Sequence, residues 1–132
     1  MLKAKIKRKD LIYPDLSYQI IGILFDVWIK MGFGYKEKFY QKAAAQGFKV
    51  SGLYFTEQLP AKIYYKGKFL GIYYFDFLIE NKIILEIKVR NYFSKKDIDQ
   101  IYSYLKVKKL KLGIITHFTK TGVKFKRVVN LN

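Results

Sequence analysis

The stretch from Tyr73 to Val89, which decides the fold, reads YYFDFLIENKIILEIKV. Two apolar runs rich in β-branched and aromatic residues flank Asn81, and this pattern predicts two antiparallel strands joined by a turn. A hairpin centred on Asn81 places Asp76 opposite Glu86, with Cβ atoms about 5 Å apart. A carboxylate inside an apolar strand is costly to bury without a partner, and like charges directly opposed are destabilising.

A bound divalent cation would offset both the repulsion and the desolvation of this acidic pair. Lys88 shares a strand face with Glu86, because side chains alternate along a strand. A simpler interpretation is that Lys88 only neutralises the acids in a partly exposed sheet, since a D-x(9)-E-x-K pattern alone is common. The hairpin therefore predicts an acidic site without establishing one.

A helix and two strands are expected after the hairpin. Ser94 is predicted to cap a helix that continues to about Val107. Gln100 and Tyr104 share one face of this helix, although a solvated helix flank would explain the pair as well. The predicted strands cover residues 110–116 and 123–129.

Two helices and a series of strands are expected before the hairpin. Pro14 suits the first turn of an amphipathic helix of about 15–18 residues, which Gly32-Phe33-Gly34 ends. Glu37 begins a second helix that extends to about Val50, where a carboxylate is favoured by the helix dipole. The predicted strands cover residues 54–59, 61–66 and 69–79, with a hairpin turn at Lys66-Gly67.

The predicted order is α, α, β-meander, α, β, β. This order indicates an α+β or α/β domain in which a central mixed sheet is flanked by helices. The chain has 132 residues, too few for the core of a second domain. We therefore expect a basic N-terminal arm at residues 1–10 and a single domain at residues 11–132.

The amino-acid composition narrows the range of possible functions. A net charge of +16 favours a polyanionic partner, nucleic acid before an anionic membrane, although solubility alone is the simpler explanation. Cysteine is absent, which excludes disulfides, Cys-ligated zinc and thiol chemistry. His117 is the one histidine, and we place it at a strand end without a catalytic role. Without a membrane-spanning run or a signal peptide, we expect a cytoplasmic protein.

The motifs also form an ordered series along the chain. The segment from Gly34 to Tyr40 spells G-x-x-E-x-x-Y. It is followed by a hairpin at residues 64–68, by Asp76, by Glu86-Ile87-Lys88 and by Gln100-x-x-x-Tyr104. From about Leu11 to Val129 this series resembles the GxxExxY family of the PD-(D/E)XK nuclease superfamily. The resemblance implies a restriction-endonuclease-like core with the acidic hairpin at its centre, although Phe75 replaces the proline of the superfamily's name.

The resemblance implies a role for each residue of the acidic hairpin. Asp76 and Glu86 would be Mg²⁺ ligands, and Lys88 would orient or activate water. Glu37 is suggested as a further acidic ligand, and we add the backbone carbonyl of Ile87. Oxygen ligands without His or Cys select Mg²⁺, with Mn²⁺ as a substitute, over zinc.

Other residues would support this site or bind nucleic acid. The Gln100/Tyr104 pair resembles the extra motif of the RecB-like branch, which supports the site and contacts nucleic acid. We assign Tyr40 a supporting role as well. The residues expected to contact phosphates are Lys95, Lys96, Lys106, Lys108 and Lys109.

The sequence thus predicts a metal-dependent nuclease that hydrolyses phosphodiester bonds, with DNA favoured over RNA. The alternative is a domain of the same fold that binds nucleic acid without cutting it, and a requirement of cleavage for Mg²⁺ separates the two. Tyr92 and Phe93 could stack on splayed bases, but ordinary packing is the preferred interpretation. No membrane partner is expected. A homodimer is left open, because duplex cutters of the superfamily often pair two active sites.

Overall fold

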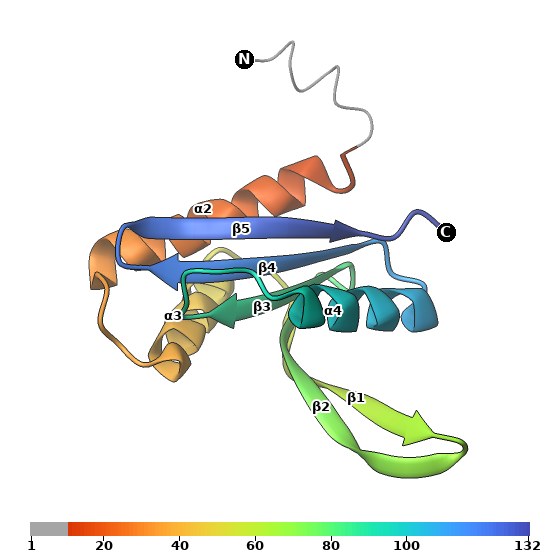
Figure 1. Ribbon diagram of the computed structural model, residues 1–132. Helices are drawn as coiled ribbons and strands as arrows, with labels where there is room; N and C mark the ends of the chain where they lie inside the picture. The colour runs from red at the N-terminus through yellow and green to blue at the C-terminus, as the bar shows by residue number, and fades with distance from the viewer. Residues whose placement is uncertain (1–10) are drawn as a thin grey trace.

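The computed structural model describes residues 11–132, so the predicted basic arm at residues 1–10 lies outside the described part. A five-stranded sheet with the order β1-β2-β3-β4-β5 forms the centre, with two helices on one face and one on the other (Figure 1). The predicted α+β architecture is therefore confirmed. The elements are α2 (Pro14–Met31), α3 (Glu37–Val50), β1 (Phe55–Tyr65), β2 (Lys68–Ile79), β3 (Ile83–Lys88), α4 (Lys95–Lys108), β4 (Leu112–Thr119) and β5 (Gly122–Val129).

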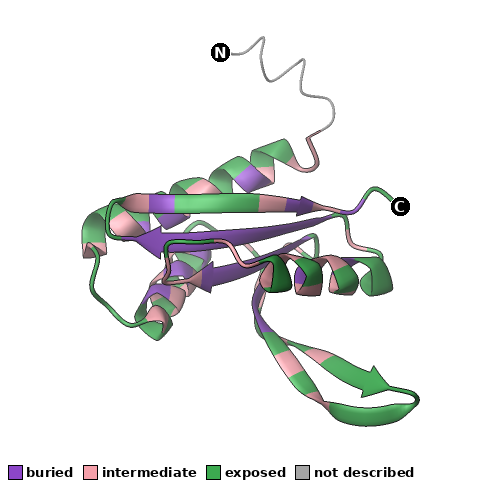
Figure 2. Ribbon diagram, viewed as in Figure 1, coloured by how far each residue is buried: buried purple, intermediate pink, exposed green. Residues whose placement is uncertain are grey.

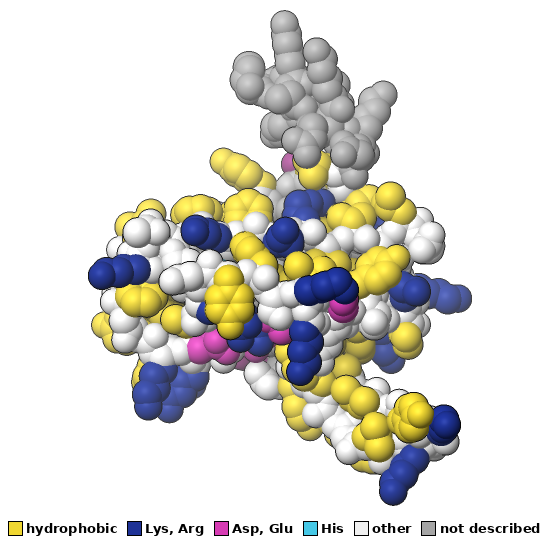
Figure 3. Space-filling view, viewed as in Figure 1, with side chains coloured by type: hydrophobic (Ala, Val, Ile, Leu, Met, Phe, Trp, Pro, Cys, Tyr) yellow, Lys and Arg dark blue, Asp and Glu magenta, His cyan; other side chains and the backbone are white. Residues whose placement is uncertain are grey.

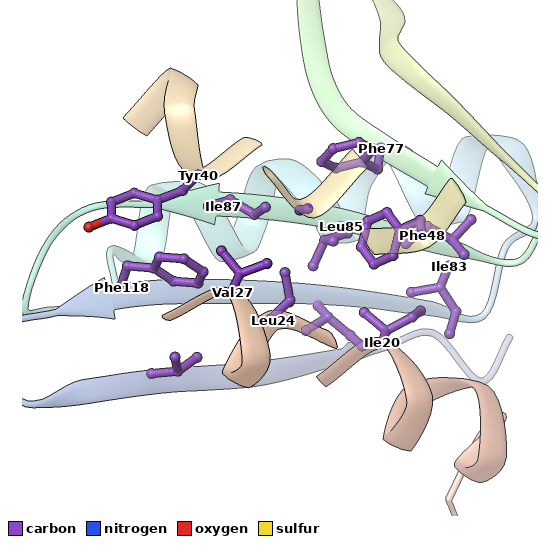
Figure 4. Close-up of a cluster of buried hydrophobic side chains, with 14 of the residues drawn as sticks. Ile20, Leu24, Val27, Tyr40, Phe48, Phe77, Ile83, Leu85, Ile87 and Phe118 are labelled. Carbon is purple, nitrogen blue, oxygen red and sulfur yellow. The ribbon is translucent and has the colours of Figure 1, made fainter. Parts of the chain in front are cut away.

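Both N-terminal helices follow their predicted boundaries. Pro14 occupies the first turn of α2, where its missing N–H has no helical partner to lose. Gly32 ends α2 with a φ of 75°, a conformation that glycine adopts without strain. The helices α2 and α3 pack on one face of the sheet, where they cover a cluster of buried hydrophobic side chains (Figure 4). A second such cluster lies on the opposite face, beneath α4.

The prediction of two strands separated by Pro60 is wrong, because β1 runs through this proline without a break. Pro60 pairs with Tyr74 of β2, and within residues 11–132 no strand pairs with the other side of β1. Proline is tolerated in an edge strand because its missing N–H can be on the side where no strand is waiting for a hydrogen bond.

Both predicted hairpin turns are confirmed. Lys66 and Gly67 have φ values of 48° and 80° between β1 and β2. Glu80 and Asn81 have φ values of 54° and 55° between β2 and β3. The pairs Ile79↔Ile83 and Phe77↔Leu85 centre this second hairpin on Asn81, as predicted.

The helix α4 connects β3 to the parallel strand β4. The Ser94 hydroxyl accepts a hydrogen bond from the Lys96 N–H at 3.2 Å, so the predicted cap is confirmed. The strand β4 extends beyond its predicted end and reaches Thr119. The prediction that His117 lies at a strand end is therefore wrong, because its side chain is fully buried within β4.

Burial is uneven across the sheet (Figure 2). Every residue of β4 is buried, and β3 is nearly as enclosed. In contrast, none of the residues 62–72 at the outer end of the β1–β2 hairpin is buried. We call these residues the hairpin arm, and Figure 1 shows that it projects away from the body of the sheet.

Candidate active site

The candidate site lies where β2 and β3 separate. The last pair in their register is Phe77↔Leu85, and Asp76 is the next residue of β2. Its Oδ2 accepts a hydrogen bond from the Ile87 N–H at 2.7 Å. The Asp76 carboxylate therefore replaces the backbone of β2 as the acceptor for β3.

The strand β2 changes its orientation at Asp76. Phe75 and Phe77 are two positions apart and would share a face in a regular strand, yet they belong to the two opposite buried clusters. Gln58 lies where β1 would pair with Asp76, and its φ is 52°. This local irregularity turns the Asp76 carboxylate toward the end of β3.

Glu37 accepts a hydrogen bond from the backbone two residues after Ile87. Its Oε1 accepts a hydrogen bond from the Val89 N–H at 3.1 Å. The amide of Gln41, one turn along α3, lies between the two acids. Its Nε2 is 3.0 Å from Asp76 Oδ1 and 3.4 Å from Glu37 Oε2. The sequence interpretation missed Gln41, although its position four residues after Glu37 places both on one helix face.

Glu86 is the second buried carboxylate, with 4% of its surface exposed, while 7% of Asp76 is exposed. The Tyr73 hydroxyl donates to Glu86 Oε2 at 3.3 Å. Burial, followed by the neighbouring charge of Asp76, raises the pKa of Glu86 to about 9. Burial also raises the pKa of Asp76, against the opposing effect of the Ile87 N–H.

Lys88 places a positive charge near both carboxylates. Its charge lowers the pKa of Asp76 and the pKa of Glu86, which opposes the effect of burial on each. Lys88 follows Glu86 by two positions, and both belong to β3. The charges of Asp76, Glu86 and Lys88 therefore act on one another. The predicted pairing of Asp76 directly opposite Glu86 is wrong, because the register of β2 with β3 ends at Phe77↔Leu85.

We predicted that Glu37, Asp76 and Glu86 would converge on one metal ion, but the structure does not bring all three acids together. Among residues 11–132, no three acidic or histidine side chains are grouped closely enough to hold a metal ion. The reason is local, because Glu37 is held by the Val89 N–H and the Gln41 amide fills the space toward Asp76.

The donor atoms at this edge nevertheless fit a hard divalent ion. Asp76 and Glu86 supply carboxylate oxygens that burial and mutual repulsion leave in need of a counter-charge. The Ile87 carbonyl faces the same gap as its N–H, because both groups of a strand residue point to one side. Acidic side chains gather beside the base of the hairpin arm in Figure 3, with Lys and Arg side chains around them.

Gln100 and Tyr104 lie near this site without touching the carboxylates. Both line a groove that also contains Tyr73, the residue that contacts Glu86. The Tyr104 ring lies 4.9 Å from the Phe75 ring, and burial raises the pKa of Tyr104. Gln100 and Tyr104 are therefore connected to Glu86 through the side chain of Tyr73.

Tyr40, the predicted supporting residue, contacts backbone groups of the loop before α3. Its buried hydroxyl donates to the Gly32 carbonyl at 2.6 Å and accepts from the Tyr35 N–H at 3.3 Å. Gly34, in the same loop, has a φ of 124° that favours glycine. The G-x-x-E-x-x-Y motif thus fixes the loop that leads into Glu37.

The residues predicted to bind nucleic acid are exposed along α4 or just after it. Lys95 forms an ion pair with Asp99 at 2.6 Å, and Lys108 lies 5.9 Å from the centre of the Tyr104 ring. The remaining predicted lysines are Lys96, Lys106 and Lys109.

Phe93 and Tyr92 have different environments. Phe93 stacks on His117 with ring centres 4.1 Å apart, which supports the packing interpretation. Tyr92 is 64% exposed beside Arg90. Burial, followed by the charge of Arg90, lowers the pKa of His117 to about 4, so the ring is neutral at pH 7.

Known proteins resemble this chain at the level of one family model. No curated protein matches the chain. The solved structure of SSO0001 is 13% identical over 87% of this chain and 77% of that chain, with a TM-score of 0.43. No helix between residues 11 and 132 is long and apolar enough to span a bilayer. Residues 14–128, from α2 through most of β5, match the family model of the PD-(D/E)XK nuclease superfamily, and the chain belongs to this superfamily.

Proposed function

We propose that this protein is a metal-dependent nuclease that hydrolyses phosphodiester bonds, with DNA favoured over RNA. The observation that carries the proposal is the buried pair of Asp76 and Glu86 at the separation of β2 and β3, with Lys88 beside both. The GxxExxY motif and the Gln100/Tyr104 pair support a place in the GxxExxY family and the RecB-like branch.

Asp76, Glu86 and the Ile87 carbonyl would hold the metal ion, which we propose is Mg²⁺ with Mn²⁺ as a substitute. When bound, such an ion lowers the pKa of water and stabilises negative charge on a phosphate. The Ile87 N–H fixes the Asp76 carboxylate and the Tyr73 hydroxyl orients Glu86. Glu37 would complete the acidic set after a small shift toward Asp76.

Lys88 would act on the phosphate itself. Its ammonium group lies close enough to both carboxylates to lower the pKa of each. A positive group at this place stabilises the negative charge that develops during hydrolysis and positions the attacking water. The exposed lysines of α4 would bind backbone phosphates and supply affinity without sequence preference.

The test is incubation of the purified protein with labelled DNA and RNA, each single-stranded and double-stranded. Each substrate is tested with Mg²⁺, with Mn²⁺ and with EDTA. The proposal expects cleavage of at least one substrate with either metal ion and none in EDTA. Binding without cleavage under every condition would favour the alternative, a non-catalytic nucleic-acid-binding domain of the same fold.

A further inference from the structure

A groove of about 800 Å³ lies beside the candidate active site, between the β1–β2 hairpin and α4. The hairpin forms one wall and the exposed side of α4 forms the other. Its lining includes aromatic rings from both walls and a lysine from each. These residues are Tyr64, Tyr73, Phe75, Tyr104, Lys62 and Lys108.

The aromatic rings of the hairpin arm are not explained by the core of the protein. Tyr64 is 58% exposed, and its ring contacts only the arm residue Phe69 among the described aromatic neighbours. The opposite wall presents Tyr104, with the Lys108 ammonium 5.9 Å from its ring centre. The groove thus offers rings to a ligand together with positive charge.

The groove is continuous with the candidate site through one residue. Tyr73 lines the groove, and its hydroxyl donates to Glu86. Asp76 follows three positions later in the same strand. A chain whose phosphate lies at the carboxylates can therefore extend along β2 into the groove.

We propose that this groove binds an unpaired strand of nucleic acid. Its bases stack on Tyr64 and Tyr104, and its phosphates lie near Lys62 and Lys108. The inference rests on the proposed function and narrows it, because it makes a single strand, or a single-stranded end, the substrate.

Three properties of the groove favour this occupant. Base faces are available for stacking only in an unpaired strand, because a duplex stacks its bases internally. A volume of about 800 Å³ is large enough for a few nucleotides. Among the described residues, the lining holds two lysines and no acidic side chain, which suits a polyanion.

The test measures binding in EDTA by fluorescence anisotropy, so that it does not depend on cleavage. The probes are a labelled single-stranded DNA of about twelve nucleotides and an abasic strand of the same length and charge. Wild type is compared with Tyr64→Ala. The matched control is Tyr65→Ala, since Tyr65 is the next arm residue, is 62% exposed and does not line the groove.

We expect wild type to bind the normal strand more tightly than the abasic strand. Tyr64→Ala should weaken binding of the normal strand by about 5-fold or more, since one base–aromatic stack contributes at least this factor. The same change should leave the abasic strand unaffected, and Tyr65→Ala should leave both unaffected. Tyr64→Phe, which keeps the ring, should bind as wild type does.

Equal affinity for the two strands, or equal losses in Tyr64→Ala and Tyr65→Ala, would overturn the inference. This result is distinguishable from failure of the nuclease proposal. Ring-dependent binding by a protein that cuts nothing leaves the groove assignment in place and removes the catalysis. Metal-dependent cleavage that Tyr64→Ala leaves unchanged, with equal binding of both strands, removes the groove assignment alone.

Discussion

Asp76 is the residue on which the site depends, because its carboxylate terminates the pairing of β2 with β3. One oxygen binds the Ile87 N–H and the other accepts from the Gln41 amide. These contacts hold a charge in a place where burial and the charge of Glu37 disfavour it. Such an arrangement indicates function rather than stability, because an apolar residue would be cheaper to bury.

The first prediction concerns Lys88. Lys88→Ala should slow cleavage by a factor on the order of 10² or more, because it removes a positive group aimed at transition-state charge. Affinity for nucleic acid should change little, since one phosphate contact is a small share of the total. Lys49→Ala, at an exposed lysine near the end of α3, serves as the matched control and should cleave as wild type does. A Lys88→Ala variant with normal cleavage would remove Lys88 from the mechanism.

A second prediction uses the buried ring of His117. Its pKa is lowered to about 4, first by burial and then by Arg90, with Lys88 also lowering it and Asp97 raising it. Between pH 6.5 and about 4 the unfolded chain binds a proton at this ring and the folded chain does not. Stability should therefore fall as the pH decreases through this window. His117→Leu should lose less stability over the same window, as measured by thermal unfolding at a series of pH values; parallel curves would contradict the assignment.

The acidic pair was predictable from the sequence, whereas its neighbours were not. Asp76 and Glu86 stand out because carboxylates are rare inside apolar strands, and a hairpin centred on Asn81 brings the two strands that carry them together. That β2 and β3 separate before Asp76 could pair with Glu86 has no signal in the sequence. Gln41 has no such signal, since an amide on a helix surface is ordinary until tertiary packing brings it to Asp76. The burial of His117 likewise depends on how far β4 extends.

At the scale of elements, helix packing explains a glycine in the interior of a helix. Gly47 lies within α3, where glycine is a poor helix former. A Cβ atom at this position would lie 2.6 Å from Cγ2 of Ile23 in α2. The glycine therefore allows the two helices to approach closely.

The third prediction follows from this contact. Gly47→Ala should lower the free energy of unfolding, because the overlap costs about 1–3 kcal/mol and exceeds the helix-propensity gain of up to about 1 kcal/mol. Gly22→Ala is the matched control, since a Cβ there meets nothing within 4 Å. The control should be stabilised by about 0.5–1 kcal/mol. Urea denaturation measures both, and a stabilised Gly47→Ala would show that Ile23 moves without cost.

Boundaries were the least predictable property of the elements. A proline such as Pro60 usually marks the end of a strand, and nothing in the local sequence indicates that β1 is an edge strand that tolerates it. The helices were predicted closely because Pro14, Gly32 and Ser94 mark their ends by local chemistry. Local signals thus gave the helices, while strand ends depended on neighbours distant in the sequence.

At the scale of the whole molecule, charge and the site have different roles. The sequence carries a net charge of +16. On the face shown in Figure 3, described Lys and Arg side chains lie around a small group of acidic side chains. In the proposed function, long-range attraction would bring a polyanion to the surface, and the buried acids would then recruit the metal ion.

The fourth prediction tests this division. Affinity for a nucleic-acid duplex should fall steeply with salt, with a log–log slope of magnitude about 4 or more, because each neutralised phosphate releases a counterion. Anisotropy titrations in EDTA over a range of KCl concentrations measure the slope. An affinity independent of salt would mean that the positive charge only keeps the protein soluble.

The most direct test of the catalytic claim compares wild type with Asp76→Asn in one cleavage assay. The asparagine keeps the size of the side chain and an oxygen for the Ile87 N–H, so the fold should be retained while the charge that holds the metal is lost. Both proteins are purified identically and incubated with labelled nucleic acid in Mg²⁺ or in EDTA. The account predicts cleavage by wild type in Mg²⁺ only and none by Asp76→Asn. Cleavage in EDTA, or equal cleavage by the two proteins, would contradict it.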